Sequence, residues 1–451
     1  MENNALFNQA LENFQEILLE NAQIPPEKSQ NYKVKRGLRN SDGTGVLAGL
    51  TNIGNVHGYS VSDDEKVADE GRLRYRGINV VDIVSACERE KRFGYEEVCY
   101  LILFGKLPTK DELENFKELL SELRPVPFDF REDIIMRCPS PDIMNKLARA
   151  VLSTYSYDPN PDGTDLLNMI RQAMLLVARV PTMVAYAYQS KLHFYDGKSL
   201  YIHHPQKELG TAENFLYMIR PDNQYTRLEA EILDLALILH AEHGGGNNSA
   251  FTTRVVSSSG SDTYSAIAAA IGSLKGPRHG GANRKVMGMI EDFKANIEDI
   301  RDADQVAAYI EKTLKKETYD HSGLIYGMGH AIYTISDPRA VLLKKKAAEL
   351  ADVTGNEEEF GLYCMIEELT PEIFAKVRGQ KMMCANVDLY SGFVYKMLNI
   401  PSELYTPMFA IARMVGWCAH RIEEVLYGGK IIRPAYKSVC EKQGYTPIEE
   451  R

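Results

Sequence analysis

Residues 165–190 read DLLNMIRQAMLLVARVPTMVAYAYQS, a stretch that is almost entirely apolar or small. A helix with an apolar surface on every side belongs in a large core or in a subunit interface. Helical patterns also dominate the rest of the chain, and no stretch alternates strand with helix as a dinucleotide-binding fold does. We therefore expect a compact, predominantly helical protein of the all-α class.

The segments around this stretch repeat the helical pattern with clear boundaries. Residues 95–123 read YEEVCYLILFGKLPTKDELENFKELLSEL and predict a helix, a Gly-Lys-Leu-Pro break and a second helix capped near Thr109. Residues 1–20 have the i, i+3, i+4 spacing of an amphipathic helix, and the tandem prolines that follow should end it. Only residues 43–60, rich in Gly, Val and Thr, indicate short strands and turns.

The composition excludes several classes of protein. The chain has 451 residues with a net charge of -10, which disfavours non-specific binding to nucleic acid or to a membrane surface. The seven cysteines are scattered and form no C-x-x-C pair, so reduced thiols fit better than disulfides or a zinc site. No apolar run is long enough to span a bilayer, and the start has neither a signal nor a transit pattern. We expect a cytoplasmic protein.

Histidines gather beside glycines in the second half of the chain. His240 and His243 close an apolar helix in LEAEILDLALILHAEHGGGNNSAF, residues 228–251. His-x-x-His could bind a metal, but the pattern lacks a third ligand at a helical offset and is not H-E-x-x-H. A polar pocket at a helix C-terminus is favoured instead, where the negative end of the helix dipole would stabilise the imidazolium.

His279 lies in SLKGPRHGGANRKV, residues 273–286, at the far end of a small-residue helix that Ser261 or Asp262 can cap. One interpretation is a tight turn with a bystander histidine. The other is that the glycines let the backbone approach a ligand closely and that the imidazole acts on that ligand.

Further candidates follow along the chain. His330 and Arg339 in GMGHAIYTISDPRA suit a carbonyl and a carboxylate, because arginine offers a bidentate fork and histidine a tunable proton. Asp388 begins an apolar helix, where a capping role is the alternative. Arg413 interrupts an apolar helix face and needs an anionic partner if it is buried. Arg433 follows two isoleucines, and one interpretation of it is a solvated surface charge.

Taken in order, HAEHGGGNNSAFTTRVV, GSLKGPRHGGAN, GMGHAIYTISDPRA, NVDLYSG and FAIARMVGWCAH resemble the motifs of the citrate synthase family, which includes 2-methylcitrate synthases. LRYRGINVVDI and YEEVCYLILFGKLPT are similar to that family's upstream segments, so the resemblance runs from about residue 38 to about residue 436. It implies an all-α, two-domain fold with a short β segment near the N-terminus. The implied parts are a helical arm (1–45), a large domain (46–283 and 390–451) and a smaller mobile domain (284–389).

The resemblance implies an acyltransferase that condenses oxaloacetate with acetyl-CoA and hydrolyses citryl-CoA, the first step of the tricarboxylic acid cycle. Asp388 matches the general base that removes the methyl proton, and His279 matches the group that hydrogen-bonds the thioester oxygen. His330 matches the group that polarises the oxaloacetate carbonyl and protonates the new alkoxide. Alternatives are a 2-methylcitrate synthase, which uses propionyl-CoA, and a catalytically silent CoA-binding relative.

The resemblance also implies the binding residues. The oxaloacetate contacts are His243, His330, Arg339, Arg413 and Arg433. Arg433 would reach the site of the neighbouring subunit, which implies a homodimer, although Ala435 stands where the family often has a second arginine. No metal and no organic cofactor are implied. The expected coenzyme A loop comprises Leu324, Ile325, Tyr326, Gly327, Met328 and Gly329.

Overall fold

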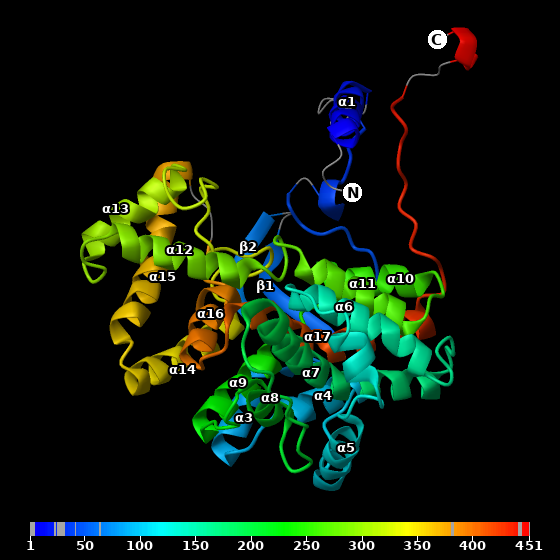
Figure 1. Ribbon diagram of the computed structural model, residues 1–451. Coiled ribbons are helices and arrows are strands. Elements are labelled where there is room, and N and C mark those ends of the chain that lie inside the picture. The colour runs from blue at the N-terminus through cyan, green and yellow to red at the C-terminus, as the bar shows by residue number, and fades with distance from the viewer. Residues whose placement is uncertain are drawn as a thin grey trace. The chain divides into compact units, whose positions relative to one another are not determined.

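The computed structural model is dominated by helices, as expected (Figure 1). The chain divides into two compact units, residues 50–432 and a terminal unit made of residues 1–49 and 433–451. The terminal unit contains the expected amphipathic helix, α1 (Ala5–Asn21), whose Phe14 and Leu18 side chains are exposed. The structure describes residues 5–21, 24, 32–40, 42–62, 65–379, 383–440 and 444–450.

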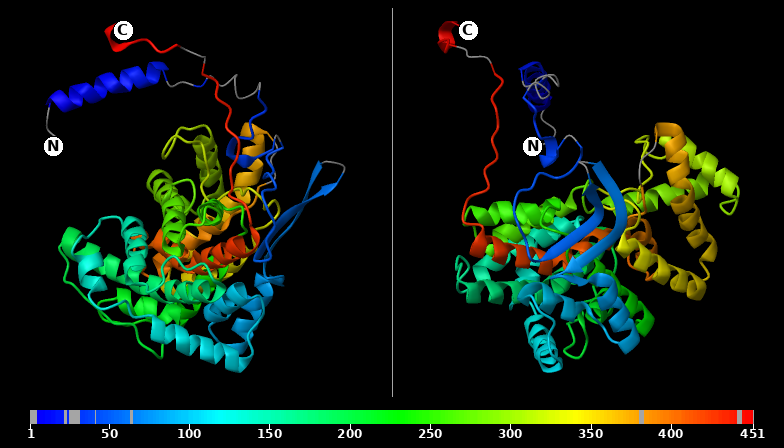
Figure 2. Two further views of the ribbon diagram at one scale, coloured as in Figure 1. Left: turned by 90° about the vertical axis from the view of Figure 1, so that its right-hand side faces the viewer. Right: turned by 180° about the vertical axis from the view of Figure 1, so that it is seen from behind.

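A small antiparallel sheet opens the larger unit. It comprises β1 (Gly54–Ser62), β2 (Glu65–Tyr75) and β3 (Ile78–Asn79), in the order β1-β2-β3, and Figure 2 shows the two long strands as a ribbon beside the helices. The sequence signal covers part of β1 only. Since β2 reads EKVADEGRLRY, its charged residues conceal the alternation that identifies a half-buried strand.

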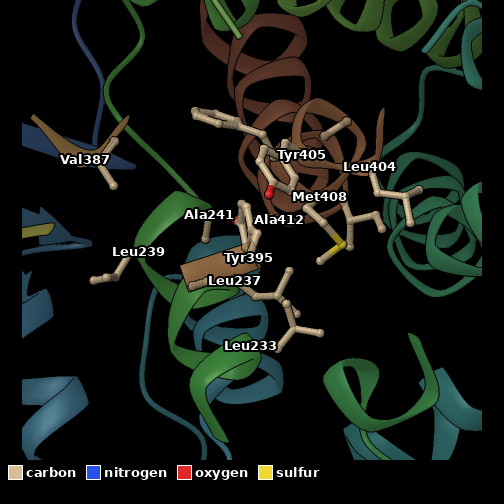
Figure 3. Packing of buried hydrophobic residues seen from close by; sticks show 14 of the residues in the cluster. Leu233, Leu237, Leu239, Ala241, Val387, Tyr395, Leu404, Tyr405, Met408 and Ala412 are labelled. Carbon is tan, nitrogen blue, oxygen red and sulfur yellow. The ribbon is translucent and has the colours of Figure 1, made fainter. Parts of the chain in front are cut away.

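Two long helices form the centre of the larger unit. Residues 165–190 form the cap and most of α7 (Leu166–Asp196), which is 31 residues long. Asp165 caps this helix, which packs on α17 (Tyr405–Tyr427). Nearly every residue of its middle section is buried, which confirms the prediction of a helix buried on all sides. Figure 3 shows part of the core, in which Leu237 and Leu239 belong to the same apolar cluster as Met408 of α17.

Shorter helices surround this pair, and α5 and α11 begin where the sequence predicts. Thr109 forms a capping box with Glu112 at the start of α5, and Asp262, not Ser261, caps α11. These helices are α3 (Val80–Glu90), α4 (Tyr95–Phe104), α5 (Lys110–Leu123), α6 (Ile143–Ser153), α8 (Thr211–Ile219), α9 (Arg227–His240), α10 (Asn248–Ser258) and α11 (Thr263–Lys275).

A second group of helices follows along the chain. Within it α13 packs on α15, while α12 and α14 both pack on α16. The group coincides largely with the predicted small domain of residues 284–389, and the division into a large domain and a smaller mobile domain stays a prediction. Its members are α12 (Ala282–Asn296), α13 (Ala303–Leu314), α14 (Pro338–Thr354), α15 (Glu357–Arg378) and α16 (Val387–Met397). Among the described residues, no helix is long and apolar enough to cross a membrane.

Candidate active site

All the predicted site residues except Arg433 lie in the larger unit. The imidazole rings of His243 and His330 are 5.2 Å apart, centroid to centroid. The charge of Arg339 acts on the carboxyl of Asp388, and the charge of Arg413 acts on the imidazole of His279. Arg433 belongs to the terminal unit, and its reach into a neighbouring site stays a prediction. The residues brought together are His243, His279, His330, Arg339, Asp388 and Arg413.

The His279 imidazole follows the C-terminus of α11 and is held through one of its nitrogens. The Ser249 backbone N–H donates to His279 Nε2 at 3.3 Å, and Ser249 Oγ lies 2.9 Å from the same nitrogen. Trp417 Nε1–H donates to Ser249 Oγ at 3.1 Å and fixes the hydroxyl. Burial, assisted by Arg413, lowers the pKa of His279 to about 4. The neutral ring therefore accepts at Nε2 and carries its proton on Nδ1.

The His330 imidazole is held through the opposite nitrogen. The backbone N–H groups of Ile332 and Tyr333 donate to His330 Nδ1 at 3.1 and 3.2 Å. With Nδ1 as an acceptor, the proton of the neutral ring is on Nε2. The two histidines thus have complementary tautomers, set by a serine in one case and by the backbone in the other.

Asp388 lies on the first turn of α16, but it is not the cap. Asn386 caps the helix and accepts the Asp388 backbone N–H at 2.9 Å. Burial raises the pKa of Asp388 to about 6, against the opposing pull of Arg339 and with a smaller contribution from Asp337. The carboxylate is ionised at neutral pH and is a stronger base than an ordinary aspartate, which suits proton abstraction.

The two arginines differ in how their guanidinium groups are satisfied. Arg339 forms a bidentate pair with Asp337, with Nε–Oδ1 at 3.0 Å and Nη2–Oδ2 at 2.7 Å. Arg413 is 1% exposed, donates from Nε to the His240 carbonyl at 2.7 Å, and has no partner for Nη2 among the described residues. Burial lowers the pKa of Arg413 to about 10. A buried guanidinium with an unpaired donor is suited to binding a small carboxylate.

The prediction that the histidine at the end of α9 carries a positive charge is wrong. Burial lowers the pKa of His240 to about 3, although its bond to the Ala236 carbonyl favours the charged form and the nearby arginines oppose it. Burial and the charge of Arg339 also hold the pKa of His243 well below its usual value. Desolvation and two neighbouring cations outweigh the helix dipole, whose effect is at most about 2 kcal/mol.

The predicted coenzyme A loop is joined to the segment that leads to Asp388. Met328 and Ala385 form an antiparallel bridge, and Gly329 N–H donates to the Cys384 carbonyl at 2.8 Å. The Asn386 amide donates to the Gly329 carbonyl, also at 2.8 Å. The loop and the start of α16 therefore form one hydrogen-bonded element.

Sequence reasoning missed several groups that complete the site. Tyr333 is buried, with its ring 4.6 Å from the His330 ring and its hydroxyl 3.3 Å from His243 Nε2. Glu242 is also buried and accepts the His420 Nε2–H at 2.9 Å. His420 and Arg413 together hold the pKa of Glu242 below its usual range against the effect of burial. All three residues lie inside the quoted motifs. Their residue types alone, however, did not indicate which side chains they contact in the fold.

The arrangement offers proton donors, a base and an arginine for a carboxylate. Within the described part of the chain, no group of three His, Cys, Asp or Glu side chains could hold a metal ion. The residues fit chemistry in which a weak carbon acid loses a proton while two neutral imidazoles donate hydrogen bonds to developing oxyanions.

Known proteins similar to this chain agree with the motifs. The family model "Citrate synthase, C-terminal domain" matches residues 41–435. A citrate synthase of Synechocystis is 34% identical over 94% of this chain and 95% of its own length. A 2-methylcitrate synthase of Corynebacterium glutamicum is 32% identical over 93% of this chain and 99% of its own.

Solved structures that are similar to this chain are also those of citrate synthases. The citrate synthase of Thermotoga maritima has a TM-score of 0.73 and 32% identity, covering 93% of this chain and 99% of its own. That of Thermoplasma acidophilum, solved in a ternary complex with carboxymethyl coenzyme A and oxaloacetate, has a TM-score of 0.75 and 26% identity over the same shares. The all-α fold expected from the sequence is thereby confirmed.

Proposed function

The chain belongs to the citrate synthase family, and from that premise we propose that it condenses oxaloacetate with acetyl-CoA and hydrolyses the resulting citryl-CoA. Family membership makes it an enzyme of citrate formation. The classification as an acyltransferase and the place at the head of the tricarboxylic acid cycle belong to this proposal. The observation that carries it is the pair of complementary histidine tautomers, together with a carboxylate of raised pKa.

Each step of the reaction has a matching group. The Asp388 carboxylate takes a proton from the acetyl methyl group, and the electron pair of that C–H bond moves toward the thioester oxygen. His279 Nδ1–H donates to this oxygen and stabilises the enol. The enol carbon then forms a bond to the oxaloacetate carbonyl carbon, while His330 Nε2–H polarises that carbonyl and protonates the alkoxide. Water finally cleaves the thioester, which releases citrate and the CoA thiol.

Binding uses the charged groups around these three residues. Arg413 provides an unpaired Nη2 donor for one oxaloacetate carboxylate. Arg339 and His243 lie close enough to His330 and Tyr333 to contact the same small ligand. The loop of residues 324–329 would hold coenzyme A, so closure of residues 284–389 would bring the thioester to Asp388 and exclude water. No cofactor takes part in this mechanism.

The proposal includes an assembly and a location. A homodimer would let Arg433 complete the neighbouring site, as the family resemblance implies. The partners are small-molecule substrates and a second copy of the chain, not nucleic acid or a membrane. All seven cysteines are free, which supports a reducing, cytoplasmic compartment.

A 2-methylcitrate synthase is the second candidate, favoured by the similarity to the Corynebacterium glutamicum enzyme. One methylene in an apolar pocket changes discrimination by only about 1–3 kcal/mol, so the same residues serve either substrate. The test is CoA thiol release with oxaloacetate and either acetyl-CoA or propionyl-CoA, compared by kcat/KM. We expect acetyl-CoA to be preferred. A propionyl-CoA preference would establish the second candidate, and no thiol from either substrate would overturn the enzymatic proposal in favour of a silent relative.

A further inference from the structure

The β1–β2 hairpin is irregular at one place. His57 pairs with Arg72 and Tyr59 pairs with Ala68, so Gly58 alone lies opposite residues 69–71. Backbone groups at such a bulge leave the regular ladder and must find other partners.

The loop that follows His330 supplies those partners. Thr334 Oγ1 hydrogen-bonds the Gly58 carbonyl, lies 3.2 Å from the Asp69 carbonyl and accepts the Asp69 N–H at 3.3 Å. Ser336 Oγ accepts the Gly71 N–H at 3.2 Å. The Thr334 hydroxyl therefore bridges both strands, and the Ser336 hydroxyl binds the backbone at the end of the bulge.

Two glycines let the loop lie directly on the strands. A Cβ at Gly58 would lie 2.6 Å from Tyr333 Cα, and a Cβ at Gly71 would lie 1.9 Å from the Ser336 carbonyl oxygen. Neither glycine has a positive φ, so what each position requires is space, not a special backbone conformation. The bulge is thus shaped to receive residues 332–336.

The same loop residues hold the His330 imidazole. The amides that donate to His330 Nδ1 belong to Ile332 and Tyr333, next to Thr334 in the chain. The Tyr333 ring packs against the imidazole and its hydroxyl reaches His243. Any shift of the loop on the hairpin would therefore move the ring that is to polarise the substrate carbonyl.

We propose that the β1–β2 hairpin is a positioning element for His330 and that Thr334 is the positioning residue that locks the loop to both strands. Thr334 acts through the backbone of Ile332 and Tyr333, not on the substrate. This inference rests on the proposed role of His330 in polarising oxaloacetate. A misplacement of about 1 Å can lower a rate about 100-fold, so a remote hydroxyl can control turnover.

The experiment compares Thr334→Val, which removes the hydroxyl, with Thr334→Ser, which keeps it. Thr313→Val is the matched control, because the hydroxyl of Thr313, on α13, also bonds two other residues. The readouts are kcat, KM for oxaloacetate, the melting temperature, and the infrared stretching frequency of the oxaloacetate keto carbonyl in the binary complex. A polarised carbonyl absorbs at a lower frequency than the free one, which a merely structural role of Thr334 would not change.

We expect Thr334→Val to lower kcat about 10- to 100-fold with little change in KM, and to move the carbonyl band toward the value of free oxaloacetate. Thr334→Ser and Thr313→Val should keep the wild-type band. A wild-type band and kcat in Thr334→Val would overturn the inference. So would an equal band shift in Thr313→Val.

If Thr334→Val does not fold, Ser336→Ala removes the bonds of that hydroxyl to the Gly71 N–H and to the Glu70 carboxylate, and should shift the band in the same direction by a smaller amount. An unchanged band in that variant would also overturn the inference. Thiol release by the wild type tests the proposed function separately, whereas the band requires only oxaloacetate binding. A failure of the proposed function and a failure of this inference would therefore give different results.

Discussion

Replacing Asp388 by asparagine should abolish turnover and at the same time stabilise the fold. Burial raises the pKa of this carboxyl from an ordinary 3.8 to about 6, although Arg339 opposes the shift. The charged carboxylate therefore has a higher free energy in the folded state than in the unfolded chain. Asn has nearly the same size and no charge, so the variant removes this cost together with the base.

The magnitude follows from the two pKa values. A difference of about two pKa units corresponds to at most about 3 kcal/mol of folding free energy. The folded protein binds the proton more tightly between pH 4 and 6, so the wild type loses stability as the pH rises through that window. Below pH 4 the carboxyl is protonated in both states, and this contribution vanishes. The stability advantage of Asp388→Asn should therefore grow from pH 4 to pH 6 and then stay constant.

Chemical denaturation at several pH values between 4 and 8 measures this advantage, with Asp352→Asn, an exposed carboxylate on α14, as the control. Thiol release measures the activity, which should fall by about 10²- to 10⁴-fold in Asp388→Asn. In the wild type, kcat/KM should drop to about a tenth of its plateau at pH 5. A stability difference independent of pH, or near-normal turnover in Asp388→Asn, would refute the reasoning.

Three further outcomes are expected. Arg413→Gln should raise KM for oxaloacetate about 10- to 100-fold, measured by steady-state thiol release, because a charge-assisted bond to a carboxylate is lost; an unchanged KM would contradict this. Ser249→Ala should lower kcat about 10-fold, since His279 Nε2 loses the hydroxyl that Trp417 orients, and a rate equal to that of wild type would exclude this role. Dialysis against EDTA should leave thiol release unchanged, whereas a loss restored by a divalent cation would show a metal requirement.

Local chemistry made much of the helical fold predictable. The spacing of apolar residues indicated the buried helix α7, and side-chain oxygens marked the starts of α5 and α11 at Thr109 and Asp262. Strand β2 was not predictable, because its partners are the neighbouring strand and the loop after His330, and neither leaves an alternating pattern in a charged sequence.

Prediction of the site from the sequence was limited in the same way. Motifs identified His279, His330 and Asp388 as candidates, but the protonation of His240 and His243 depends on burial and on Arg339, which lies about a hundred residues further along the chain. Helix-end position alone predicted the wrong charge. Tertiary neighbours decide protonation, and one sequence does not reveal them.

His279 as a neutral donor and Asp388 as a charged base occur together only above about pH 6. His279 has a pKa of about 4 and Asp388 one of about 6, so at neutral pH the imidazole is neutral and the carboxylate charged. A charged imidazole would donate more strongly, but its positive charge would also lower the pKa of a nearby base. In the proposed mechanism, a neutral donor held in one tautomer by Ser249 would stabilise the enol without weakening Asp388. Above about pH 6, therefore, burial leaves the His279 imidazole neutral while the Asp388 carboxylate is charged, so that donor and base are present together.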